Sequence, residues 1–277
     1  MTSVLRSTAR FIKDSVILFA SPRRLQERFR IWDNLVKLEM LPSNGGRRAR
    51  VSGFQIFYFD KPTLIYLYRE IFVLGTYYFR SSNPEPIILD CGANIGIATL
   101  FFKSLFPAAT ILSFEPDPAS FHLLEKNISN NALQNVTPYN LALWDENSEV
   151  QFFTDSANPG SLHMSTNVHR LAGTPISVPA RRLSDFITGT VDFLKLDVEG
   201  AELRVLQELV RSGKINSIRQ MVVEYHHKIP GEPSAMSAFL RILEDNHFEY
   251  QITTYGSSIA VPDRFQDVMI YAYQPAR

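Results

Sequence analysis

From residue 87 onward, short apolar runs alternate with longer segments that carry apolar residues at helical spacing. The short runs predict buried strands, and the longer segments predict amphipathic helices. Strands are expected at 87–89, 110–114, 136–140, 193–196 and 220–225, and helices at 97–106, 118–131, 201–212 and 234–246. Continuous apolar strands that alternate with helices favour an α/β fold with a mostly parallel sheet covered on both faces. The last two strands, 250–254 and 268–273, have no helix between them and are expected to pair antiparallel.

The first 86 residues have a different pattern. Residues 1–42 mix apolar and basic positions at helical spacing, and the Pro- and Gly-containing segment 42–46 predicts a linker. A strand-like run at 54–59 and a helical stretch at 63–74 follow. We therefore expect three parts. A helical, basic extension covers residues 1–50, a lead-in strand and helix at 51–86 pack on the main domain, and the main α/β domain covers residues 87–277.

Charge and cysteine content narrow the function classes. The chain holds 28 Lys and Arg against 28 Asp and Glu, so no overall basic field indicates nucleic acid. Residues 1–50 alone hold 11 basic and 4 acidic residues, which is typical of a solvated helical face or of docking to a second subunit or an anionic surface. The single cysteine, Cys91, excludes an internal disulfide and a cysteine-based zinc site and fits a cytoplasmic protein. The apolar run at 16–20 is too short for a membrane span.

The strongest chemical signal is the loop that follows the first predicted strand, with the sequence DCGANIG at 90–96. Gly92 and Gly96 permit a tight turn and let a ligand contact the backbone around Asn94. The loop lacks the G-x-G-x-x-G spacing of dinucleotide sites. It opens with Asp90, which suits a cationic amine better than a pyrophosphate. The sequence therefore favours S-adenosylmethionine over NAD, with Asp90 near the amino-acid end of the cofactor, directly or through water.

Two later strand ends complete the predicted cofactor site. Glu115 lies 19 residues after Gly96, which is close to the spacing of one βαβ step, and its carboxylate can accept hydrogen bonds from both ribose hydroxyls. The alternative is that Glu115 and Asp117 only cap the following helix. At 140–145 the adenine could lie against apolar side chains, including Ala142.

Several segments, in chain order, resemble the FkbM-type methyltransferase family. They are DCGANIG at 90–96, FEP at 114–116, NLAL at 140–143, KLDVEGAE at 195–202 and VEYH at 223–226, preceded by EIF at 70–72 and by Tyr77. The resemblance covers residues 66–250 and implies a class I methyltransferase with a Rossmann-like sheet, S-adenosylmethionine as methyl donor, and hydroxyl acceptors on polyketides, sugars and related metabolites. The segment 181–185 departs from the family pattern, and residues 1–50 lie outside it.

The acceptor side should lie at two further strand ends. Transfer to an alcohol requires alignment with the methyl group, exclusion of water and a base or a metal for the proton. Asp197 should lie beside the methyl group because its strand should neighbour the first strand, while Glu224 and His226 share strand parity and can face the same side. His226 has the intrinsic pKa of a general base, about 6.5. Glu202 is expected to stabilise the start of a helix, and Glu199 could serve either role.

The sequence therefore predicts an S-adenosylmethionine-dependent methyltransferase that acts on a hydroxyl of a small molecule, sugar or other glycan. Asp197, Glu224 and His226 could also hold Mg²⁺, but we expect no metal, since carboxylates near a sulfonium need none. A non-catalytic nucleoside-binding or interaction module and a nicotinamide-dependent oxidoreductase stay open as alternatives, as does nitrogen methylation. The acceptor pocket is expected to involve the variable loop 155–175 and the N-terminal extension, through which the chain could also form an oligomer or dock to a surface.

Overall fold

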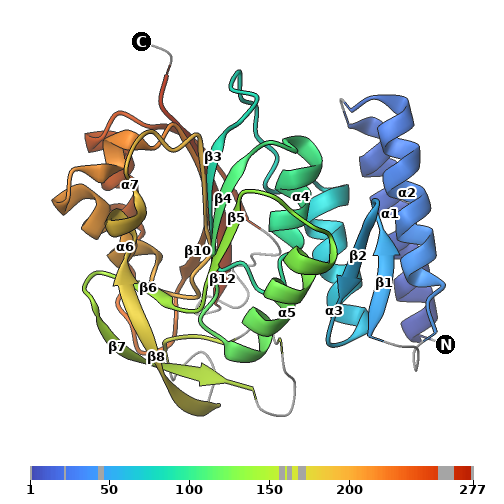
Figure 1. Cartoon of the computed structure of the whole chain (residues 1–277), viewed down its shortest axis with the longest axis horizontal. Coiled ribbons are helices and arrows are strands. Elements are labelled where there is room, and N and C mark those ends of the chain that lie inside the picture. The colour runs from blue at the N-terminus through green and yellow to red at the C-terminus, as the bar shows by residue number, and fades with distance from the viewer. Residues whose placement is uncertain are drawn as a thin grey trace.

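A seven-stranded sheet forms the centre of the protein in the computed structural model (Figure 1). The structure describes residues 2–21, 23–42, 47–155, 160, 164–167, 173–254 and 265–275, with side chains from residue 10 onward. The strand order is β11-β12-β10-β9-β3-β4-β5. The strands are β3 (Ile87–Cys91), β4 (Thr110–Phe114), β5 (Val136–Tyr139), β9 (Phe193–Leu196), β10 (Gln220–His227), β11 (Glu249–Thr254) and β12 (Gln266–Tyr273).

The pairing of these strands confirms the predicted α/β fold. Strands β5, β4, β3, β9 and β10 are mutually parallel, whereas β12 runs antiparallel to both of its neighbours, β10 and β11. The last strand is therefore inserted between β10 and β11, and it is antiparallel as expected. Because β3 is paired with both β4 and β9, the ends of the strands that carry the predicted site residues lie next to one another.

Helices cover both faces of the sheet, as the alternating pattern predicts. Helices α4 (Ile97–Leu105) and α5 (Pro118–Asn130) lie on one side, and α6 (Glu202–Arg211) and α7 (Met236–Asp245) lie on the other (Figure 1). Each helix buries its apolar stripe against the sheet, which is what limits these helices to one orientation. A separate three-stranded sheet is formed by β6 (Ala142–Trp144), β8 (Thr174–Arg182) and β7 (Ser148–Thr154) in that order.

The N-terminal part consists of two helices, a hairpin and a third helix. They are α1 (Thr2–Ala20), α2 (Leu25–Glu39), β1 (Arg48–Val51), β2 (Phe54–Phe57), α3 (Lys61–Tyr68) and a π-helical turn, Arg69–Val73. Strand β1 runs across the division expected at residue 50, and the expected linker lies outside the described residues except for Pro42. Buried side chains of α1 and α2 belong to the same apolar core as the sheet residues Ile88 and Phe193.

One buried arginine joins the extension to the rest of the chain. The Nε atom of Arg69 lies 2.6 Å from Asp14 of α1, and its Nη2 atom lies 3.1 Å from Glu39 at the end of α2. Arg69 and Asp14 are each 9% exposed in their side chains, so this ion pair is well shielded from water. The extension is therefore held in a fixed position against the π-helical turn.

Asn127 in the last turn of α5 and Asn131 directly after the helix hold the lead-in hairpin, and Asn127 also contacts the glycine loop. Asn127 accepts from the amide of Phe57 at 2.7 Å and donates to the carbonyls of Phe57 and Ile95. Asn131 makes the equivalent pair of bonds with Gln55. These side chains satisfy the free edge of β2, and the bond to Ile95 connects that edge directly to the loop of the predicted cofactor site.

Candidate active site

A cavity with an empty volume of about 860 Å³, including the part open to solvent, lies at the carboxyl ends of β3, β4 and β9. Ligands of open α/β sheets bind at this edge. The cavity is lined by Leu67, Ile71, Tyr77, Gly92, Ala93, Asn94, Ile97, Ala98, Phe114, Glu115, Pro116, Leu141, Ala142, Leu143, Phe152, Met164, Thr166, Lys195, Asp197, Val198 and Glu199. Five of the predicted site residues are among them, namely Gly92, Asn94, Glu115, Ala142 and Asp197.

The glycine loop has the close contacts that its sequence predicts. Gly92 has φ +81°, and a Cβ atom there would lie 1.7 Å from the backbone oxygen of Asp197. Gly96 has φ +90°, and its Cβ would lie 2.7 Å from Leu124 of α5. Both positions therefore need glycine. Between them, Asn94 also adopts a positive φ, 49°, and its side chain accepts from the next backbone amide at 2.8 Å, which stabilises that conformation.

The side chain of Asp90 does not line the cavity, which differs from the predicted place near the cofactor. It is fully buried, accepts from Thr99 Oγ1 at 2.6 Å and has Lys195 Nζ 3.7 Å away. Burial raises the pKa of this carboxyl. Lys195 lines the cavity, and its ammonium group is the contact that links the Asp90 side chain to the lining.

Lys195 lines the cavity and is a residue that the sequence did not single out. Its Nζ atom donates to the carbonyl oxygens of Gly92 at 2.7 Å and Cys91 at 3.2 Å, and lies 3.4 Å from Asp197 Oδ2. Burial opposes the charge, but Asp197 and Asp90 outweigh it and raise the pKa of the ammonium group. The signal was present in the sequence, because a lysine inside the otherwise apolar strand FLKL must find a partner for its charge.

Glu115 and Asp117 occupy different positions at the end of β4. Asp117 accepts from the amide of Ser120 at 2.8 Å and caps helix α5. Glu115 lines the cavity and is held by the amides of Asn94 at 2.8 Å and Asp117 at 2.9 Å. Burial raises the pKa of Glu115 to about 8. A carboxylate so enclosed has a fixed position at the end of β4, with the glycine loop on one side.

His226 and Glu224 lie behind the cavity wall and are not among the residues that line it. His226 Nδ1 donates to Glu202 Oε1 at 2.8 Å, and its Nε2 lies 3.4 Å from Glu199 Oε2 and 3.7 Å from Asp267. Glu202 also accepts from the amide of Gly200 at the start of α6. The same carboxylate therefore contacts both the helix start and His226. The imidazole therefore reaches the cavity through Glu199, which does line it.

Glu199 is presented by a strained turn. Its φ of 58° and the φ of 107° at Gly200 place two successive residues in the left-handed region. A Cβ at Gly200 would lie 2.9 Å from Ile229, so the second position favours glycine. Positive φ at a residue other than Gly, Asn or Asp is uncommon and is frequent at functional sites. The Asp-Val-Glu-Gly motif thus builds the turn that points Glu199 toward the cavity.

Glu224 lies behind Tyr77, which lines the cavity. The Tyr77 hydroxyl donates to Glu224 Oε2 at 3.4 Å, and Lys195 Nζ lies 5.2 Å from the centre of the Tyr77 ring. Burial, together with the charge of Asp197, raises the pKa of Glu224 to about 8. Tyr77 therefore contacts both the lysine and the carboxyl group from the lead-in segment.

Among the described residues, two groups have ligand atoms close enough to hold a cation. They are Asp197, Glu199 and His226, and Glu224, His226 and Asp267, with the atoms of each group within 4.8 Å of one another. The trio considered from the sequence, Asp197, Glu224 and His226, is divided between these groups. The acceptor loop predicted at 155–175 lies largely outside the described residues.

A family model for the "Methyltransferase FkbM domain" matches residues 90–250, which is more than half of the chain. The chain belongs to the FkbM methyltransferase family. The match begins at Asp90 and includes both motifs that form the cavity, Gly92–Gly96 and Asp197–Gly200. Membership confirms the methyltransferase predicted from the sequence and does not favour the oxidoreductase or the binding module.

Three curated methyltransferases are similar to this FkbM-family chain. Methyltransferase 1 of Beauveria bassiana (strain ARSEF 2860) is 28% identical over 52% of this chain and 66% of its own length. Methyltransferase sdnD of Sordaria araneosa is 29% identical over 72% of this chain and 86% of its own. The 31-O-demethyl-FK506 methyltransferase FkbM of Streptomyces tacrolimicus is 29% identical over 64% of this chain and 79% of its own length. The chain thus spans just under two thirds of the Beauveria protein and most of the other two.

Proposed function

We propose that this protein transfers the methyl group of S-adenosylmethionine to a hydroxyl oxygen of a small molecule or glycan. The observation that carries the proposal is one cavity that has Glu115 and the glycine loop on one side and the carboxylates Asp197 and Glu199 on another. Family membership supports the methyl transfer, and the name of the Streptomyces relative, a 31-O-demethyl-FK506 methyltransferase, supports oxygen as the acceptor atom.

The residues present fit the cofactor. The Glu115 carboxylate would accept from the two ribose hydroxyls, and Leu141, Ala142 and Leu143 offer an apolar wall for the adenine. Asp197 Oδ1 is buried and has no hydrogen-bond partner among the described residues, so it offers a free acceptor for the ammonium group of the methionine part. S-adenosylmethionine supplies an electrophilic methyl group when it is bound, and the protein has to provide position and a proton acceptor.

The acceptor side is assigned to the carboxylates and to His226. Glu199 faces the cavity and would accept the proton of the acceptor hydroxyl, while His226, fixed by Glu202, stands 3.4 Å behind it to share that proton. Tyr77 lines the cavity and would orient the acceptor from the lead-in side, with its hydroxyl held by Glu224. Burial alone would raise the pKa of Glu202, but His226 and the Gly200 amide outweigh burial and lower that pKa. The Glu202 carboxylate therefore stays ionised next to the imidazole.

The experiment that tests the proposal is methyl transfer from isotopically labelled S-adenosylmethionine to a panel of hydroxylated and amine-containing acceptors. Label recovered on a hydroxyl compound supports the proposal. Label confined to amines contradicts oxygen as the acceptor, and no transfer to any acceptor contradicts an active enzyme. Glu199→Gln and His226→Ala should lower turnover about 10²–10⁴-fold at unchanged cofactor affinity, which is the usual contribution of general acid–base catalysis.

A further inference from the structure

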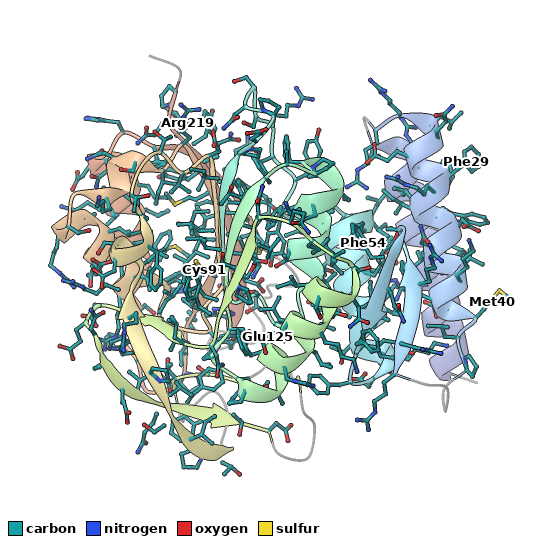
Figure 2. The ribbon with its side chains drawn as sticks, viewed as in Figure 1. Phe29, Met40, Phe54, Cys91, Glu125 and Arg219 are labelled. Atoms are coloured by element: carbon teal, nitrogen blue, oxygen red, sulfur yellow. The ribbon has the colours of Figure 1, made fainter. Side chains whose placement is uncertain are left out.

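The N-terminal helices carry an apolar face that nothing in the described structure covers. Six large apolar side chains of α1, of α2 and of the residue that caps α2 are exposed, between 37% and 78% each; they are Ile12, Val16, Ile17, Leu25, Phe29 and Met40. Figure 2 shows Phe29 and Met40 on the outer side of the helix pair, pointing away from the sheet. We call this surface the outer helix face.

The outer helix face is continuous across the two helices. Ile12 and Val16 lie one turn apart on α1, and Leu25 and Phe29 lie one turn apart on α2. The ring of Phe19 contacts the ring of Phe29, with centroids 5.2 Å apart, so the two stripes meet where the helices pack. The opposite sides of both helices are buried in the core, so the outer helix face makes no contact with that core.

Exposed positive charge surrounds the apolar stripes. Arg10, Lys13, Arg24 and Arg30 are exposed and form no ion pair among the described residues. All four acidic residues of residues 1–50 are already in ion pairs. Asp14 and Glu39 both pair with buried Arg69, while Glu27 pairs with Arg23 and Asp33 with Lys37. Because Asp14 and Glu39 both pair with the buried Arg69, they do not neutralise the exposed basic residues, and the outer helix face is strongly basic.

We propose that the outer helix face docks on an anionic phospholipid bilayer. A bilayer surface accepts apolar side chains into its acyl boundary and offers negative headgroups to flanking Lys and Arg, which is the arrangement of interfacial helices. A second copy of the chain fits less well, because a twofold contact through this face would bring the same positive charges together. In the described part of the chain, no helix is long and apolar enough to cross a membrane, so docking would place the helices on the surface.

Flotation of the full chain with vesicles tests this proposal independently of the methyltransferase activity. Binding is expected to vesicles of phosphatidylcholine mixed with phosphatidylglycerol, to be much weaker to phosphatidylcholine alone, and to fall as salt is raised. The double variant Phe29→Ser, Met40→Ser should lower the partition coefficient about tenfold or more. Lys13→Gln, Arg24→Gln and Arg30→Gln should lower it about fivefold per charge removed.

Matched controls lie outside the N-terminal helices. Ile252→Ser changes an exposed apolar residue of β11, and Arg241→Gln removes an exposed charge of α7; neither should change vesicle binding. All variants are at exposed positions, so thermal melting should match the wild type. Failure of the folded wild type to float with anionic vesicles overturns the proposal. So does a dimer in light scattering that Phe29→Ser, Met40→Ser dissociates, because the face would then bind a second copy.

Discussion

Gly92 approaches Asp197 so closely that replacing it by alanine should test the geometry of the whole cavity. The backbone at Gly92 has φ +81°, and the added Cβ would lie 1.7 Å from the Asp197 carbonyl oxygen. No rotamer change can relieve this contact, because the atom it meets belongs to the backbone. Either the glycine loop or the end of β9 must move, and both line the cavity.

The magnitude has two parts. A residue with a Cβ in the left-handed region costs roughly 1–2 kcal/mol. Overpacking of a tightly packed site typically adds about 1–3 kcal/mol. Gly92→Ala should therefore lower the free energy of unfolding by about 2–5 kcal/mol. Gly213 supplies the matched control, since it has φ +72° but nothing within 4 Å of its added Cβ, and only the first part applies there.

Urea unfolding of the two variants measures the difference directly. Gly92→Ala should be less stable than Gly213→Ala by about 1–3 kcal/mol, and only Gly92→Ala should weaken S-adenosylmethionine binding in calorimetric titration. Equal stability of the two variants, together with equal cofactor affinity, would refute the close contact between the glycine loop and Asp197.

Three further predictions concern charge. Lys195→Met should destabilise the protein by about 3–5 kcal/mol in urea unfolding, because Asp90 and Asp197 lose their shared cation; Lys37→Met, in an exposed pair, should change stability by less than about 1 kcal/mol. Burial raises the pKa of Glu115 to about 8, so the cofactor-free folded state retains a proton that the unfolded state loses. Stability should then fall as pH rises from about 4.5 toward 8, and thermal melts of Glu115→Gln should lack that part of the fall; identical pH profiles would contradict it. Methyl transfer should survive EDTA, because Lys195 already neutralises Asp197; activity lost to EDTA and restored by Mg²⁺ would contradict metal independence.

The sheet and the glycine loop were predictable because their signals are local. Short apolar strands, a glycine pair and an acid at the next strand end each specify a conformation within a few residues, and a parallel sheet brings the strand ends together. The insertion of β12 between β10 and β11 was not predictable in the same way. Local pattern shows that the last strands pair antiparallel, but not which neighbour lies on the other side.

The sequence predicted five of the residues that line the cavity, but it did not predict which predicted residues are enclosed behind them. Asp90 and His226 are enclosed because Lys195 and Glu199 stand between them and the cavity, and these contacts join segments far apart in the chain. The position of the N-terminal extension was not predictable either, because it also depends on contacts between segments far apart in the chain. Its placement depends on Arg69 reaching Asp14 and Glu39, which no periodicity of residues 1–50 can indicate.

The most direct test of the central claim is calorimetric titration of the purified protein with S-adenosylmethionine and, separately, with NAD⁺ and NADH. We expect saturable binding of S-adenosylmethionine alone, strongly weakened in Glu115→Ala and unchanged in Glu125→Ala, which removes an exposed carboxylate from α5 (Figure 2). Binding of NADH, or no binding of S-adenosylmethionine to protein shown to be folded, would contradict the proposed function.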